Sequence, residues 1–227
     1  MNILAIDTTT KKANVAVEIN DKVKTNSIDN EITHSEKLLP LIDSTLKECN
    51  ITIKDIDVLA CTTGPGSFTG IRIGLSTVKA LSKVTGAKIF CIDSLKLLAH
   101  CVDTKNYTLV VPLIDAKHNR AYANIFLKNE DDLQSTILPE NKYLDDILKD
   151  VENFCSTNKI DAKNVLLIAD SLDIKSYISD KYDCMLASLN MNELVRLATL
   201  SQDFTNYLNL DATYVRSSEA ERTKYGE

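Results

Sequence analysis

The sequence lacks long apolar runs, and its cysteines show no pairing motif. No stretch approaches the ~20 consecutive apolar residues that span a bilayer, and the amino terminus has no basic segment of the kind that opens a signal peptide. The six cysteines are scattered without a C-x-x-C pair. This favours reduced, buried thiols over a disulfide framework or a structural zinc site. We therefore expect a cytoplasmic protein with no membrane contact.

The sequence is also poor in groups for metal binding, hydrolysis and polyanion binding. Its three histidines, His34, His100 and His118, form no His-x-x-x-His pair, so a helical metal clamp is excluded. Ser35 and Ser67 lie in no Gly-x-Ser-x-Gly elbow, which weakens a hydrolase triad. A formal net charge of −6 argues against the chain alone being the main binder of a nucleic acid.

Glycine is scarce but concentrated. Four of the six glycines fall within residues 64–74, GPGSFTGIRIG. No lysine follows Gly70, so the segment is not a Walker A loop, and a threonine at position 69 excludes Gly-x-Gly-x-x-Gly. Gly64, Pro65 and Gly66 are predicted to form a structural turn from a strand into a helix.

Two interpretations of the glycine segment remain open. A helix amino terminus here could hold an anion through its free amides. Alternatively, Gly70 and Gly74, four residues apart, clear one helix face for a close neighbour, within this chain or in a partner. Each interior glycine costs roughly 1 kcal/mol relative to alanine, so two on one face favour the steric interpretation.

Hydrophobic periodicity predicts an α/β layer protein. The expected strands cover residues 3–6, 14–19, 22–28, 56–61, 87–92 and 165–169, and the expected helices cover residues 35–50, 68–84, 94–101, 144–155 and 192–200. In addition, residues 3–7 resemble residues 111–115, and Ala13 matches Ala121 at the same spacing of 108. Such self-similarity indicates a duplication. We expect two subdomains, 1–104 and 105–227, whose last helix can pack back on the first subdomain.

Each predicted copy has a strand that ends at an aspartate. Asp7, followed by Thr8 and Thr9, and Asp115 resemble the phosphate loops of the actin/hexokinase/Hsp70 group, where a carboxylate holds the water of Mg²⁺. Neither loop contains the glycine that lets a backbone approach phosphate. The alternative, that each aspartate ends a strand and caps a turn, is preferred to tight ATP binding.

Several motifs together resemble the bacterial TsaB (YeaZ) family. They are Asp7-Thr8-Thr9, residues 34–40 (HSEKLLP), residues 64–74, Asp115-Ala116 followed by Tyr122, and a weaker match at Tyr214-Val215-Arg216. The resemblance runs from the first residue to about Tyr122. Lys117-His118 departs from the usual basic pair of the family, and Ala212 replaces its usual proline.

The resemblance implies a duplicated actin-like ATPase (ribonuclease H-like) fold with a mixed sheet and flanking helices in each subdomain. It also implies a non-catalytic scaffold in the formation of N6-threonylcarbamoyladenosine at A37 of ANN-decoding tRNAs. The implied partners are the metal-dependent transferase TsaD, which this chain would activate, and the ATPase TsaE, with tRNA contacted only indirectly. The alternative is an ATP-dependent transferase or glycoprotease-like peptidase acting alone.

The resemblance also implies that the helices at residues 35–50 and 68–84 form the contact with TsaD, or a homodimer when the chain is alone. The predicted interface residues are Ser35, Leu38, Leu39, Ile42, Gly70, Ile71, Gly74, Leu75 and Val78. No catalytic residue, metal or cofactor of its own is expected. A nucleotide with Mg²⁺ at the interface of the complex is left open.

Overall fold

The chain folds as two compact units. The structure is a computed structural model that describes residues 1–29, 34–129, 132–178 and 180–215. Unit 1 combines Met1–Ser94 with Asn190–Tyr214, and unit 2 comprises Leu95–Leu189 and Val215. Within the described residues, no helix is long and apolar enough to cross a membrane.

Unit 1 is a five-stranded mixed sheet with helices on it. Its strands are β1 (Ile3–Asp7), β2 (Lys12–Ile19), β3 (Lys22–Asp29), β4 (Val58–Thr62) and β5 (Lys88–Ile92), in the order β3-β2-β1-β4-β5. The first three strands are antiparallel, and β1, β4 and β5 are parallel. Strands β1 and β4 are buried along their whole length, as their uninterrupted apolar sequence predicts for the centre of a sheet covered on both faces.

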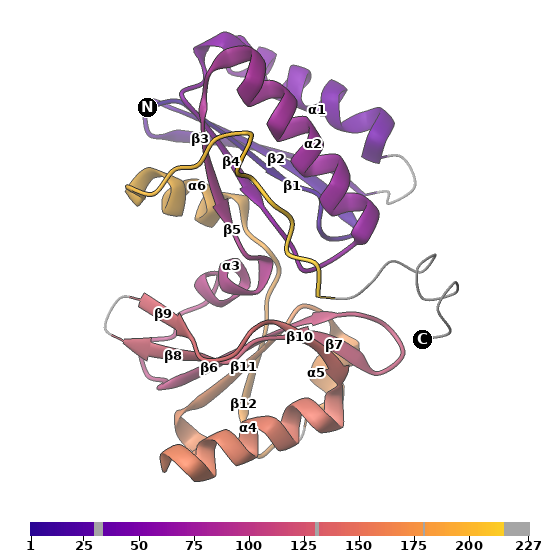
Figure 1. Ribbon diagram of the computed structural model, residues 1–227, viewed down its shortest axis with the longest axis vertical. Coiled ribbons are helices and arrows are strands. Elements are labelled where there is room, and N and C mark those ends of the chain that lie inside the picture. The colour runs from indigo at the N-terminus through magenta and orange to yellow at the C-terminus, as the bar shows by residue number, and fades with distance from the viewer. Residues whose placement is uncertain (30–33, 130–131, 179, 216–227) are drawn as a thin grey trace. The chain divides into compact units, whose positions relative to one another are not determined.

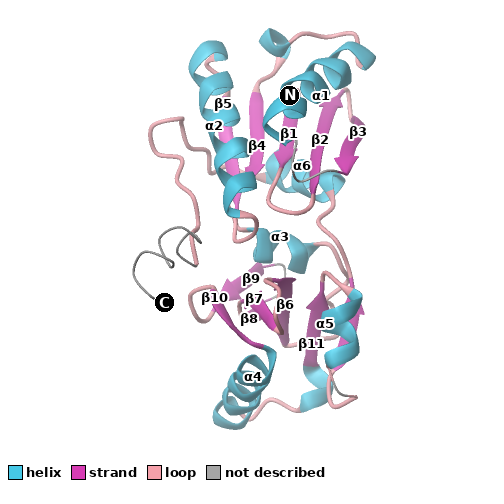
Figure 2. Cartoon of the chain, turned by 90° about the vertical axis from the view of Figure 1, so that its right-hand side faces the viewer, coloured by secondary structure: helices cyan, strands magenta, loops and turns pink. Residues whose placement is uncertain are grey.

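The amphipathic helices α1 (His34–Glu48) and α2 (Phe68–Thr85) share one apolar core with this sheet. Helix α1 contacts β2 and β3, whereas α2 contacts β1, β4 and β5 (Figures 1 and 2). The Ser67 side chain caps α2 by accepting a hydrogen bond from the Gly70 amide. Gly86, with φ of 78°, ends the helix in the left-handed conformation that glycine adopts without strain.

Unit 2 repeats the same arrangement with more strands. They are β6 (Leu109–Asp115), β7 (Arg120–Ala123), β8 (Phe126–Asn129), β9 (Asp132–Ser135), β10 (Glu140–Tyr143), β11 (Val165–Ala169) and β12 (Asp183–Leu186). The sheet order is β10-β7-β6-β11-β12, with β8 paired to β6 and β9. Helices α4 (Leu144–Asn158) and α5 (Leu172–Tyr177) lie between these strands in the sequence and contribute to one apolar core. Short 3₁₀ helices, η2 (Ile53–Asp55) and η3 (Ala162–Asn164), precede β4 and β11.

The two units have the same topology, which confirms the predicted duplication of a mixed sheet with flanking helices. Strand β6 occupies the place of β1, because each lies between an antiparallel hairpin partner and a parallel strand. The match is not residue by residue at a spacing of 108, however. Ile6 packs in the core that contains α1 and α2, whereas Ile114 packs in the core that contains α3 (Ser94–His100). Alternate residues of a strand face opposite sides of its sheet. The structurally equivalent residues of β1 and β6 are therefore separated by a spacing that differs from 108 by an odd number of residues.

The third helix of each copy lies with the other copy. Helix α3 follows β5, yet its residues Leu95 and Leu98 pack with β6 and β11 in unit 2. Helix α6 (Met191–Leu200) follows β12, yet it packs against β1, β2 and β4 of unit 1. The observed division therefore differs from the predicted boundary between residues 104 and 105: it falls after Ser94, and residues 190–214 return to unit 1.

Candidate functional site

Asp7, at the carboxyl end of β1, is fully buried and saturated with hydrogen bonds. Its Oδ1 atom accepts from the Thr9 amide at 3.1 Å, the Thr9 hydroxyl at 2.6 Å and the Thr62 hydroxyl at 2.6 Å. Its Oδ2 atom accepts from the Asn14 side-chain amide at 3.3 Å. A carboxylate offers about four acceptor positions, so this aspartate is committed to linking the ends of β1, β2 and β4.

The turn after β1 is covered by the glycine segment. The Ser67 amide donates to the Thr9 carbonyl at 2.7 Å, and the Thr8 hydroxyl donates to the Gly70 carbonyl at 2.7 Å. A Cβ atom added at Gly66 or Gly70 would overlap the Thr9 or Thr8 carbonyl oxygen, and one at Gly74 would overlap the Thr8 hydroxyl. The close neighbour that these glycines accommodate is therefore the turn after β1, within the same unit.

The carboxyl-terminal part of unit 1 also contacts the glycine segment. The Thr213 amide donates to the Thr63 carbonyl at 2.8 Å, and the Thr213 carbonyl lies against Gly64, whose φ is 102°. The Arg72 guanidinium stacks on Phe68, with Cζ 4.0 Å from the ring centroid, and its Nε donates to the Tyr214 hydroxyl at 3.2 Å. Only the weak sequence match at Tyr214 pointed to this contact; Arg216 of the same motif lies outside the described residues.

This packing corrects the predicted interface. Leu38, Ile42, Ile71, Leu75 and Val78 are between 0% and 6% exposed, and Gly70 and Gly74 are buried as well. A buried side chain cannot bind a partner while unit 1 stays folded, so these seven positions are core residues. Of the predicted set, Ser35 and Leu39 are exposed, and Leu39 is 56% exposed.

The cysteine expectation is also wrong in part. The structure describes all six cysteines and joins none of them in a disulfide, but only Cys61 and Cys155 are buried, and Cys91 is exposed. Burial raises the pKa of the Cys61 thiol, which keeps this thiol protonated and unreactive.

Unit 2 has a different polar group at the corresponding edge of its sheet. Asp115, at the end of β6, accepts from the Lys117 amide at 2.7 Å and forms an ion pair with the Lys117 Nζ at 2.6 Å. The Asp115 amide donates to Oδ1 of Asp170 at 3.0 Å, and Asp170 is the residue directly after β11. Burial raises the pKa of Asp170 to about 6, and the neighbouring charge of Asp115 adds to this rise.

The two aspartates that the sequence singled out are therefore not equivalent. Asp7 is buried and pairs with no cation in the described part of the chain, whereas Asp115 is partly exposed and bound to a lysine. Sequence reasoning missed Asp170, although it directly follows a buried strand. Among the described residues, no three His, Cys, Asp or Glu side chains converge in a group that could hold a metal ion.

Comparison with known proteins places the chain. The model of the TsaD family, described as tRNA N6-adenosine threonylcarbamoyltransferase, matches residues 28–168, more than half of the 227 residues. The chain belongs to the TsaD family. Curated relatives within it include tRNA threonylcarbamoyladenosine biosynthesis protein TsaB of Bacillus subtilis, 29% identical over 66% of this chain and 65% of that protein.

TsaB of Buchnera aphidicola is 34% identical over 56% of this chain and 61% of its own, and TsaB of Escherichia coli is 31% identical over 57% of each. These relatives confirm the resemblance to TsaB. The chain matches between half and two thirds of their length.

Two solved structures from Pseudomonas aeruginosa share the fold of this TsaD-family chain. One, described as similar to peptidase YEAZ, has a TM-score of 0.75 at 18% identity, covering 95% of this chain and 99% of its own. The other, YeaZ, has a TM-score of 0.72 at 16% identity, covering 94% and 100%.

Gly70→Ala tests the packing of α2 on the turn after β1. In an exposed helix interior this change would stabilise the protein by ~1 kcal/mol. Here the added methyl group meets the Thr8 carbonyl, so we expect the free energy of unfolding in urea to fall by ~2 kcal/mol or more. Ser76→Ala, at an exposed position of the same helix, is the matched control and should change it by less than ~0.5 kcal/mol. Equal effects of the two variants would contradict the assignment.

Asp170→Asn tests the partly buried carboxyl group of Asp170. Because the folded pKa of about 6 exceeds the ~3.9 of an unfolded aspartate, the folded state binds this proton more tightly. The contribution of Asp170 to the free energy of unfolding therefore falls as the pH rises from ~4 to ~6 and is constant above. We expect Asp170→Asn to remove this decline and to raise stability at pH 7 by ~2 kcal/mol. Asp173→Asn, at an exposed position, should leave the wild-type pH profile unchanged, and a decline that persists in Asp170→Asn would refute the assignment.

Proposed function

We propose that this chain is a non-catalytic scaffold subunit in the formation of N6-threonylcarbamoyladenosine at A37 of ANN-decoding tRNAs. In this role it pairs with and activates a metal-dependent transferase of the TsaD type. The observation that carries the proposal is the state of the turn after β1. The Asp7 carboxylate before the turn accepts hydrogen bonds from Thr9 in the turn, Asn14 on β2 and Thr62 on β4, and the backbone of the turn is covered by α2.

A nucleotide-dependent enzyme of this fold would need free space there. Phosphate binding requires accessible amides, and Mg²⁺ requires a carboxylate oxygen open to its water. In unit 1 the Thr9 amide is used by Asp7, and the Ser67 amide at the start of α2 is used by the Thr9 carbonyl. The loop that would hold phosphate instead fixes the position of α2. This supports the scaffold over an ATP-dependent transferase.

The names of the relatives support the pathway. The matching curated proteins are named for tRNA threonylcarbamoyladenosine biosynthesis, and a transferase from Rhizobium johnstonii matches 38% of this chain at 32% identity. We propose that the chain acts in the cytoplasm in a complex completed by the TsaE ATPase, and that tRNA reaches it mainly through that complex. Any nucleotide with Mg²⁺ would lie at the interface with the partner. Alone, the chain would form a homodimer through the partner-binding surface.

The partner-binding surface is proposed on the outer side of α1 and α2. The buried positions of both helices belong to the core, so the contact depends on side chains such as Ser35 and Leu39. Leu39 and Val84 are 56% and 83% exposed. Exposed apolar side chains on neighbouring helices are suited to the desolvated centre of an interface, which is depleted of charge.

Leu39→Asp tests this surface. A carboxylate in the centre of an interface costs several kcal/mol because it cannot be solvated there, so we expect the affinity for the organism's TsaD protein to fall by about a hundredfold, or ~2.7 kcal/mol, in a co-purification or titration assay. Leu200→Asp, at a 65% exposed position of α6, is the matched control and should bind normally. Circular dichroism should show both variants folded. If the complex survives Leu39→Asp, the assigned surface is wrong.

Incubation of the purified chain alone with ATP and Mg²⁺ distinguishes the scaffold from an enzyme acting alone. We expect no turnover, because the Asp7 carboxylate has no access to a metal-bound water. The decisive comparison is with Asp7→Asn. Turnover by the wild-type chain that disappears in this variant would overturn the scaffold assignment. Peptide hydrolysis by the chain alone would equally favour the glycoprotease-like alternative.

A further inference from the structure

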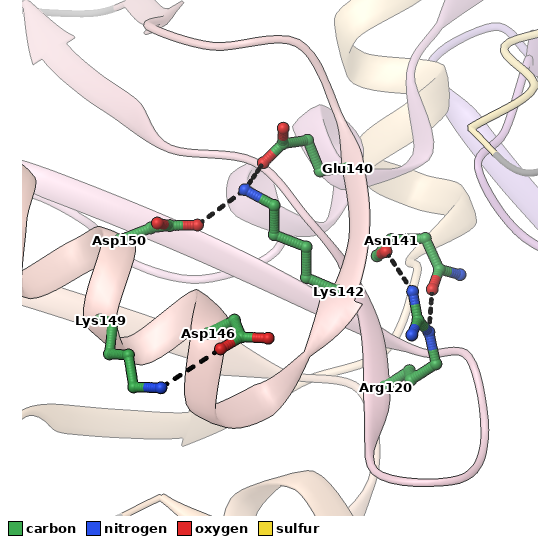
Figure 3. A network of polar contacts seen from close by, with 7 residues as sticks. All are labelled: Arg120, Glu140, Asn141, Lys142, Asp146, Lys149 and Asp150. Atoms are coloured by element: carbon green, nitrogen blue, oxygen red, sulfur yellow. Dashed lines mark hydrogen bonds and ion pairs between the residues drawn. The ribbon is translucent and has the colours of Figure 1, made fainter.

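Arg120, at the start of β7, is held rigidly by β10. Its Nε donates to the Asn141 side-chain oxygen at 2.7 Å and its Nη2 donates to the Asn141 carbonyl at 2.7 Å. Its Cζ lies 4.5 Å from the centroid of the Tyr143 ring. Figure 3 shows this guanidinium beside the ion pairs of β10 and α4. Two hydrogen bonds and a ring fix the plane of the guanidinium before any ligand arrives.

This cation differs from its neighbours in having no anionic partner among the residues that the structure describes. Lys142 forms ion pairs with Glu140 and Asp150, and Lys149 pairs with Asp146 (Figure 3). Arg120 is bound by a neutral amide and a carbonyl, and within the described part of the chain no carboxylate lies within ion-pair distance of it. In unit 1, the cation at the start of β2, Lys12, does face a carboxylate, that of Asp29 at 3.8 Å. The positive charge of Arg120 is thus available to an external anion.

The adjoining β6–β7 hairpin has a strained backbone. Lys117, His118 and Asn119 have φ of 66°, 56° and 56°, which is the left-handed region that residues other than glycine seldom adopt. The equivalent hairpin of unit 1, between β1 and β2, has no positive φ. Strain of this kind persists where the surroundings require it, and it clusters at ligand-binding segments. Here it places three exposed polar side chains beside Arg120.

An aromatic face and a buried donor complete the group. The Tyr143 side chain is 53% exposed, so part of it is accessible although the guanidinium stacks on the ring. The Asn141 Nδ2 atom is buried and has no hydrogen-bond partner among the described residues. A preorganised guanidinium suits phosphate oxygens, and an exposed aromatic ring suits an unstacked base. A carboxylate peptide would use the guanidinium but not the ring.

We propose that Arg120 and Tyr143, with the hairpin residues 117–119, form a contact site for single-stranded RNA. Arg120 binds a backbone phosphate and Tyr143 supports an adjacent base. The identification of that RNA with tRNA rests on the proposed function. The net charge of −6 makes the site an auxiliary contact, with weak affinity in the isolated chain.

The test uses the full chain and total tRNA as the probe, with ultraviolet cross-linking, mass-spectrometric mapping and fluorescence anisotropy. We expect cross-links within residues 117–120 or 140–143. Arg120→Gln and Tyr143→Leu should each raise the Kd about tenfold, and Arg120→Lys should recover only part of the loss because lysine has no planar fork. Lys12→Gln, which removes a cation from the corresponding hairpin of unit 1, should change the Kd less than twofold.

Several outcomes would overturn the site. These are no cross-link to wild-type protein, cross-links confined to other segments, equal weakening by Arg120→Gln and Lys12→Gln, or full competition by a polyglutamate peptide but not by a single-stranded oligonucleotide. Thermal melts verify folding, and if Arg120→Gln unfolds, Tyr143→Leu and Arg120→Lys decide. Co-purification with TsaD is measured on the same variants. If Arg120→Gln weakens RNA binding but the wild-type chain does not bind TsaD, the proposed function alone is refuted. If the wild-type chain binds TsaD but Arg120→Gln binds RNA as well as the wild type does, this site alone is refuted.

Discussion

The contact between the turn after β1 and the first turns of α2 determines the organisation of unit 1. Thr8 and Thr9 meet Gly66, Gly70 and Gly74 at distances that exclude even a methyl group. The same turn orients the Asp7 carboxylate, which links three strands. A single close approach therefore connects the sheet, the helix and the loop between them.

The regular elements of unit 1 could be predicted from the sequence because its strands and amphipathic helices are strongly periodic. The partner of the glycine face could not. Spacing reveals that Gly70 and Gly74 share one side of a helix, but it does not reveal whether the neighbour is another chain or a turn sixty residues earlier. Seven predicted interface residues are consequently core residues. Burial, which depends on the whole fold, was the missing information.

The duplication illustrates a second limit. Similar sequences around Asp7 and Asp115 indicated the repeated topology, yet the alignment is shifted. Ile6 packs with α1 and α2, whereas Ile114 packs with α3, on the face of its sheet that does not correspond. A one-residue shift preserves the apolar character of a buried strand but reverses its faces. Arg120 escaped sequence reasoning for a related reason. Its lack of a carboxylate partner among the described residues follows from the pairing of β7 with β10, because Arg120 contacts Asn141, 21 positions away, and no local pattern encodes this contact.

The exchange of helices between the two copies has a consequence for synthesis on the ribosome. The last strand of the first sheet ends at Ile92, but the helix that covers its remaining face begins at Met191. A nascent chain that has completed this sheet must expose an apolar surface until α6 has been synthesised, about one hundred residues later. Amino-terminal domains usually fold first during translation, whereas unit 1 cannot complete its core before α6 has been synthesised. A premature stop codon between these positions would therefore leave both copies incomplete.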